Sequence, residues 1–166
     1  MKRICVAVSL FVFCLVLPVT AGAADVSKLQ LSGDLTMEQA HVVLAAAVQK
    51  AQDQKTLMNI AVVDAGGNLK AFVRMDGAYL ASIDISMRKA TTARGLNMPT
   101  TELAKAAQPG QPLYGIQVLD GTMAIFGGGE LLKNTDGVII GAIGVSGDSV
   151  ENDVACAQAG AAALLR

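Results

Sequence analysis

Residues 62–78 read VVDAGGNLKAFVRMDGA, and this stretch decides the fold of the 166-residue chain. An apolar segment, Met58–Val63, leads into its turn. Beyond the turn, Leu, Ala, Val and Met alternate with Lys, Phe, Arg and Asp over Leu69–Asp76, which is the period-2 pattern of a strand with two different faces. Gly66–Asn68 tolerate the positive φ that tight turns require. The stretch therefore predicts a β-hairpin.

The first 23 residues have the pattern of a cleaved secretory signal. Lys2 and Arg3 precede an apolar run over Ile4–Val19, and Ala21–Ala23 fits the small-x-small rule of signal peptidase. The apolar run is shorter than the roughly 20 residues that a membrane-spanning helix needs, and an uncleaved anchor is the alternative. We expect a periplasmic or secreted protein without stable membrane insertion after cleavage.

The charge and cysteine content change once this signal is removed. Loss of Lys2 and Arg3 leaves eleven basic against fourteen acidic residues, a formal charge of −3. The charges are scattered and form no basic stripe, so no nucleic-acid partner is expected. Cys156 is then the one cysteine left, which excludes an intramolecular disulfide. We interpret it as a small buried apolar residue, with an intermolecular bridge as the alternative.

The mature chain has the length of one domain. Residues 24–35 are polar and irregular and are expected to form a flexible N-terminal arm, whereas residues 36–166 are expected to form a single folded domain. Thr36 and Gln39 have the spacing of a capping box. Apolar spacing and end signals predict helices over Met37–Gln54, Leu80–Gly95, Thr100–Ala107 and Val150–Leu165.

A second hairpin is expected between the third and fourth of these helices. Met123–Phe126 has the composition of a short strand, and Val138–Val145 that of a long apolar strand. Asn134–Gly137 contains an Asp-Gly turn signal between them. Hairpins with helices before, between and after them indicate the α+β class, an antiparallel sheet covered by helices.

Four motifs, in this order, resemble the GlcG/HbpS family of haem-binding domains, to which the C-terminal domain of PduO-type corrinoid proteins is similar. The resemblance covers essentially the whole mature chain. The motifs are LTMEQA at 35–40, DAGGNL…RMDGA…S within 64–82, FGGG at 126–129 and GAIGVSG…D…CA within 141–157.

This resemblance implies a profilin-like fold, with an antiparallel sheet of about five strands and helices packed on it. It also implies assembly into a homo-oligomer and makes haem the expected cofactor. Members of the family include secreted haem-binding proteins, domains attached to corrinoid enzymes, and proteins of glycolate-utilisation operons without a settled activity.

His41 is the only histidine of the chain. On the first predicted helix it lies roughly 100° from the centre of the apolar face, at 100° per residue, so it borders the core. Neutral imidazole is a common iron ligand, which makes His41 the candidate metal ligand if haem binds. The resemblance points the same way, because some related domains use a histidine of this helix as a haem or corrinoid ligand. A structural or exposed histidine is the alternative.

The other candidate cofactor-binding residues follow the first hairpin. Arg74 presents a planar fork suited to haem propionates or a small anionic ligand, and Lys89 on the next helix could contact the same anion. Phe126, Gly127 and Gly128 could form a backbone concavity that holds an anion. The alternatives are an ion pair that fixes the corner at Arg74, and a bulge or close packing at an oligomer interface for the glycines.

No catalytic residue is assigned, because the chain lacks H-E-x-x-H, C-x-x-C and G-x-S-x-G. A non-enzyme is therefore favoured. The leading hypothesis is an exported haem-binding protein that acts as a carrier, scavenger or sensor component. Two alternatives stay open: an accessory protein or enzyme acting on a small carboxylate or corrinoid-related metabolite, and an oligomeric scaffold without a ligand.

Overall fold

The computed structural model describes residues 33–119 and 121–165. The predicted signal and most of the predicted arm lie outside these residues. The described residues also include two short 3-10 helices, Ile116–Val118 and Ala163–Leu165. In chain order, the main elements are α1 (Met37–Asp53), β1 (Asn59–Asp64), β2 (Leu69–Arg74), α2 (Ala81–Leu96), α3 (Thr100–Ala106), β3 (Gly129–Lys133), β4 (Ile139–Ser146) and α4 (Val150–Ala162).

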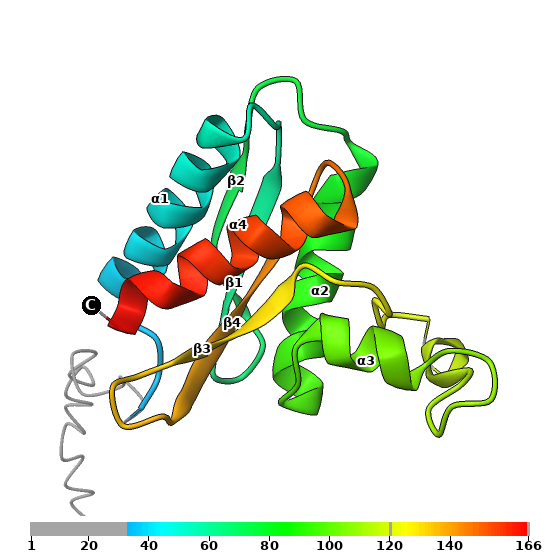
Figure 1. Cartoon of the computed structure of the whole chain (residues 1–166). Coiled ribbons are helices and arrows are strands. Elements are labelled where there is room, and N and C mark those ends of the chain that lie inside the picture. The colour runs from blue at the N-terminus through cyan, green and yellow to red at the C-terminus, as the bar shows by residue number, and fades with distance from the viewer. Residues whose placement is uncertain (1–32, 120, 166) are drawn as a thin grey trace, which may run out of the picture. The chain divides into compact units, whose positions relative to one another are not determined.

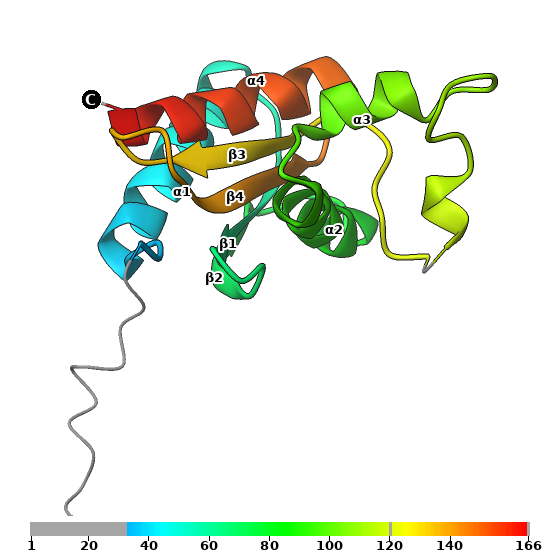
Figure 2. The ribbon, with the colours of Figure 1, turned by 90° about the horizontal axis from the view of Figure 1, so that it is seen from below.

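The strands form one antiparallel sheet in the order β2-β1-β4-β3. Helices α1 and α4 pack on each other and on one face of this sheet, whereas α2 covers the other face (Figures 1 and 2). This arrangement confirms the predicted α+β class and antiparallel sheet. Among the described residues, no helix combines the length and the apolarity needed to cross a membrane.

The prediction of about five strands is wrong, because the sheet that residues 33–119 and 121–165 form has four strands. The predicted strand Met123–Phe126 is also wrong, since this segment joins no ladder. The backbone N–H of Ala124 donates instead to the hydroxyl of Thr92 on α2, at 3.0 Å. The partner of β4 in the second hairpin begins only at Gly129. A short apolar run has no periodicity that separates a strand from a buried loop.

The two local signals at the start of the domain are confirmed. At the N-terminus of α1, the N–H of Gln39 donates to the hydroxyl of Thr36 at 3.1 Å, and the N–H of Thr36 donates to the Gln39 side chain at 2.9 Å. In the β1–β2 turn, the carboxylate of Asp64 accepts hydrogen bonds from the N–H groups of Gly66 and Asn68, each at 2.9 Å. These bonds satisfy backbone donors that neither a helix nor a strand ladder can satisfy.

A bulge in β2 changes the direction of one side chain. Val62 pairs with Ala71 but Val63 pairs with Leu69, so Lys70 is the extra residue. A bulge re-aims a side chain that regular alternation would place on the other face. The ammonium of Lys70 lies 3.6 Å from the carboxylate of Asp34, just before α1. Leu35 is buried in the core, so the folded domain includes the last two residues of the predicted arm.

Cys156 is buried, as predicted. Cys156 on α4 donates from Sγ to the side-chain oxygen of Gln54 at 3.0 Å, and burial raises the pKa of its thiol to about 11. Because the thiolate is the reactive form, we expect the folded protein to resist labelling by DTNB at neutral pH and to react fully once unfolded. The absorbance of released thionitrobenzoate measures both states. Rapid labelling of the folded protein would contradict this burial.

Candidate functional site

Four of the six predicted site residues come together where α2 meets the start of α4. They are Lys89, Phe126, Gly127 and Gly128. The ammonium of Lys89 donates to the carboxylate of Asp153 at 2.6 Å and to the carbonyl oxygen of Val145 at 2.9 Å. The ring of Phe126 lies over the same ammonium, with its centroid at 4.7 Å, within the range of a cation–π contact. Three groups from separate parts of the chain, those of Phe126, Val145 and Asp153, therefore meet at one buried charge.

The glycine loop, residues 126–129, closes around this ammonium. At Gly128 the backbone has φ +112°, and a Cβ there would lie 2.8 Å from the Lys89 nitrogen and 2.7 Å from the Val145 oxygen. No side chain fits in that space. The loop is therefore packed tightly within the chain itself. Gly127 is as crowded, since its Cβ would lie 2.7 Å from Val154, 2.8 Å from Thr101 and 3.0 Å from Val150.

The charge that the glycine loop holds is positive. Its Gly129 N–H is already used, since it donates to the hydroxyl of Thr100 at 2.8 Å. The side chains of Lys89 and Asp153 are 0% and 3% exposed. Burial lowers the pKa of Lys89 and raises that of Asp153, and the ion pair opposes both shifts. The structure thus gives Lys89 an internal carboxylate as its anion, and Asp153 is the partner that sequence spacing did not reveal.

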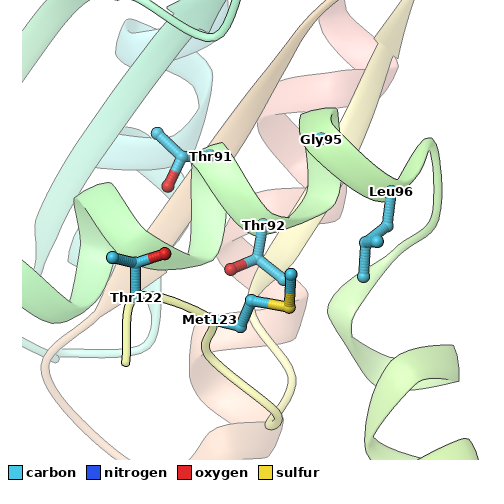
Figure 3. Close-up of a pocket in the computed structure, with 6 residues that line it drawn as sticks. All are labelled: Thr91, Thr92, Gly95, Leu96, Thr122 and Met123. Atoms are coloured by element: carbon cyan, nitrogen blue, oxygen red, sulfur yellow. The ribbon is translucent and has the colours of Figure 1, made fainter. Parts of the chain in front are cut away.

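A cavity of about 210 Å³ lies between α2 and the segment that precedes the glycine loop. Thr92, one turn beyond Lys89 on α2, and Met123 of that segment face each other across it (Figure 3). Ligand pockets measure roughly 300–1,000 Å³, so this cavity suits only a small molecule. Its lining residues are Thr91, Thr92, Gly95, Leu96, Thr122 and Met123.

The other two predicted residues lie away from this cluster. Arg74 is exposed at the end of β2, an edge strand that β1 separates from β4. His41 is exposed on α1, on the opposite face of the sheet from α2. Arg74 lies at the end of β2 that is remote from the β1–β2 turn. It is five residues beyond Leu69, which corresponds to about 16 Å at the usual rise per residue of a strand. The six predicted residues therefore form one cluster of four and two separate surface positions.

The surface around His41 combines an imidazole with an apolar neighbour and carboxylates. Met37, one helical turn earlier, is 56% exposed. Within the described residues, His41 makes no hydrogen bond and no ion pair. The pKa of Glu38 is lowered, mainly by a backbone hydrogen bond and by Thr36, with smaller contributions from the charges of His41 and Lys70. The imidazole is thus free to bind a ligand from solution.

A sequence model of the family described as "Haem degrading protein HbpS-like" matches residues 35–162. The chain belongs to this HbpS-like family. The resemblance that the four sequence motifs indicated is thereby confirmed. The match begins at Leu35 and ends within the last turn of α4, so it covers nearly every described element of the HbpS-like chain.

Solved structures and a curated enzyme resemble this HbpS-like chain. A crystal structure of a PduOC–haem complex has a TM-score of 0.75 and 39% identity, covering 78% of this chain and 94% of that one. HbpS of Streptomyces reticuli, solved as a double mutant, has a TM-score of 0.73 and 35% identity, covering 90% and 97%. Corrinoid adenosyltransferase PduO of Salmonella typhimurium is 39% identical over 131 residues, which are 78% of this chain but 39% of the enzyme. The chain thus spans well under half the length of that relative.

Proposed function

We propose that this protein is an exported haem-binding protein, acting as a carrier, scavenger or sensor component. One observation carries the proposal: the PduOC structure, which is 39% identical and covers 78% of this chain, is a complex with haem. The HbpS-like family description also names haem. Export rests on the signal pattern of the first 23 residues.

His41 fits the role of iron ligand. Its imidazole is exposed and makes no hydrogen bond or ion pair within the described residues. Exposed Met37, one turn earlier on α1, offers an apolar contact to a porphyrin face. Bound haem would supply an iron atom that accepts an imidazole nitrogen. Arg74 is the candidate for contact with an anionic edge, because its exposed guanidinium suits carboxylates, and since it lies apart from His41 within one chain, that contact would come from a second copy.

The cavities support a surface site or a site shared between copies. Four cavities along the described part of the chain have volumes of about 210, 270, 220 and 310 Å³. These volumes are at or below the lower end of the roughly 300–1,000 Å³ of ligand pockets, so none of the four encloses a porphyrin. We therefore propose that haem lies against an exposed face, and that a second copy covers its other face in a homo-oligomer.

A haemin titration of the purified protein tests this proposal. We expect a saturable Soret shift with the wild type and a weaker, displaced Soret band with His41→Ala, because the axial nitrogen is lost. Arg74→Ala is expected to lower the affinity without moving the band. Gln52→Ala, an exposed position later on α1, is the matched control and should behave as wild type.

Three outcomes of the titration are decisive. A wild type without a Soret shift would overturn haem binding. A shift that is identical in His41→Ala would overturn only the role of His41. In a parallel titration with cobalamin, binding of cobalamin but not of haemin would favour the second candidate, an accessory protein for a corrinoid-related metabolite. The 39% identity to part of corrinoid adenosyltransferase PduO supports that candidate.

A further inference from the structure

The segment between α3 and β3, residues 107–128, is long for a connection within one domain. Apart from one 3-10 helix, its described residues contain no helix or strand. Connections longer than roughly 12–15 residues without secondary structure are uncommon and usually carry a function. In both views this segment extends outward beyond α3, away from the sheet (Figures 1 and 2). It therefore does more than join two elements.

The outer part of this segment, residues 108–119, exposes apolar side chains and carries no charge, and is here termed the uncharged loop. None of its residues is buried. Tyr114, Val118 and Leu119 are 65%, 78% and 81% exposed. Apolar surface gathered in this way marks a contact site for a protein or a membrane. A groove of about 270 Å³ in the loop is lined by Pro112, Leu113, Tyr114, Gly115, Ile116 and Leu119.

The backbone of the uncharged loop is held by hydrogen bonds within the chain. The N–H of Leu113 donates to the carbonyl oxygen of Ala106, at the end of α3, at 3.0 Å. The N–H of Val118 donates to the carbonyl oxygen of Gly115 at 2.9 Å. The loop thus presents its apolar side chains on an ordered backbone, which lowers the entropic cost of association.

We propose that the uncharged loop is an interface between two copies of this chain, related by a two-fold axis. Beside such an axis each side chain lies near the same side chains of the other copy, so a charged residue there would meet its own charge. Residues 106–119 contain no Lys, Arg, His, Asp or Glu, which suits this position. A membrane surface fits less well, because membrane-binding segments use Lys and Arg to meet anionic headgroups.

The surface beside the uncharged loop supplies a polar rim. Glu102 and Lys105 on α3 pair at 2.8 Å, with side chains 55% and 74% exposed. Interfaces have a centre depleted in charge and a polar rim, and a rim with both signs of charge does not repel its own copy. A stable interface takes roughly 20–30 residues per partner. Residues 100–119 come close to this number, so the interface includes α3 as well as the loop.

This interface goes beyond haem binding and does not depend on it. His41 and Arg74, the proposed haem contacts, lie outside the uncharged loop and α3. Haem and the second copy that binds this loop therefore do not compete for a residue. The interface can be tested in the absence of haem.

Sedimentation velocity of the purified haem-free protein over a range of concentrations tests the interface. We expect the wild type to associate, and Leu119→Glu to raise the dissociation constant at least about a hundredfold, because like charges then meet. Leu119→Lys should have the same effect. A mixture of the two variants should recover association, since opposite charges then face each other. Only an interface between copies of this chain gives that recovery.

Val138→Glu is the matched control, because Val138 is 53% exposed in the turn between β3 and β4. It should sediment as the wild type does. Circular dichroism verifies that each variant is folded. A monomeric wild type would overturn the interface, as would association that Leu119→Glu leaves unchanged or that Val138→Glu also abolishes.

Cosedimentation with phosphatidylglycerol vesicles distinguishes a membrane from a second copy. We expect the wild type to stay in the supernatant. A monomeric wild type that binds the vesicles, with binding lost in Leu119→Glu, would overturn the second copy in favour of a membrane. None of these outcomes bears on haemin binding, which the Soret titration measures separately.

Discussion

Lys89→Met is expected to lower the free energy of unfolding by about 3–5 kcal/mol, because it leaves the carboxylate of Asp153 buried without its partner. The two side chains are 0% and 3% exposed, so water cannot replace the lost ammonium without opening the structure. Methionine keeps the unbranched shape of lysine and fills most of the same space. The loss therefore comes mainly from the unpaired charge and not from a cavity.

Guanidinium denaturation followed by circular dichroism measures this loss. In the double variant Lys89→Met with Asp153→Asn, the buried charge is gone, and the total loss should be clearly smaller than the sum of the two single losses. Lys105→Met is the control. Lys105 pairs with Glu102 at 2.8 Å with side chains 74% and 55% exposed, and such surface pairs contribute about 1 kcal/mol at most. A Lys89 loss as small as that of Lys105 would contradict a buried ion pair.

Local patterns predicted most helices and the first hairpin. These signals are local. The capping box at Thr36 and the turn at Asp64 each join residues that are three or four positions apart, and the apolar spacing of α1 and α2 repeats within a few residues. The residue that follows α2, Asn97, has a left-handed backbone with φ +51°, and asparagine is one of the residue types that mark such a helix end in a sequence. These signals locate elements well because they do not depend on the rest of the fold.

The candidate site could be predicted only in part, because its contacts join distant residues. Lys89 and Asp153 are 64 residues apart, and a lysine is seldom fully buried, so nothing local indicated an internal pair. In a strand of regular alternation, Lys70 would lie on the same face as Phe72. The bulge at Lys70 turns its side chain to the other face, and the period-2 pattern of the sequence does not show this bulge. The motif at 126–129 was proposed as a concavity for an anion, whereas in the structure its glycines make room for the Lys89 ammonium.

Gly144→Ala is expected to cost about 3 kcal/mol or more, out of the roughly 5–15 kcal/mol that stabilise a domain. Gly144 lies on β4 where α2 crosses the sheet, and its Cβ would be 2.0 Å from the carbonyl oxygen of Ser86 and 2.5 Å from the backbone nitrogen of Ala90. Both atoms belong to the helix backbone, which cannot rotate away as a side chain can. A glycine inside a strand is weakening unless another backbone must come close, and here the backbone of α2 does.

Gly95→Ala gives the opposite sign and so separates steric contact from a general effect of the substitution. Gly95 lies within α2 and has nothing within 4 Å of its Cβ position. Alanine there should stabilise the protein by roughly 0.5–1 kcal/mol through helix propensity. Thermal unfolding of both variants and the wild type ranks the three proteins. Equal stability of Gly144→Ala and Gly95→Ala would contradict the close packing of α2 on β4. The methyl group added at residue 144 needs space that the two backbones do not leave in this structure.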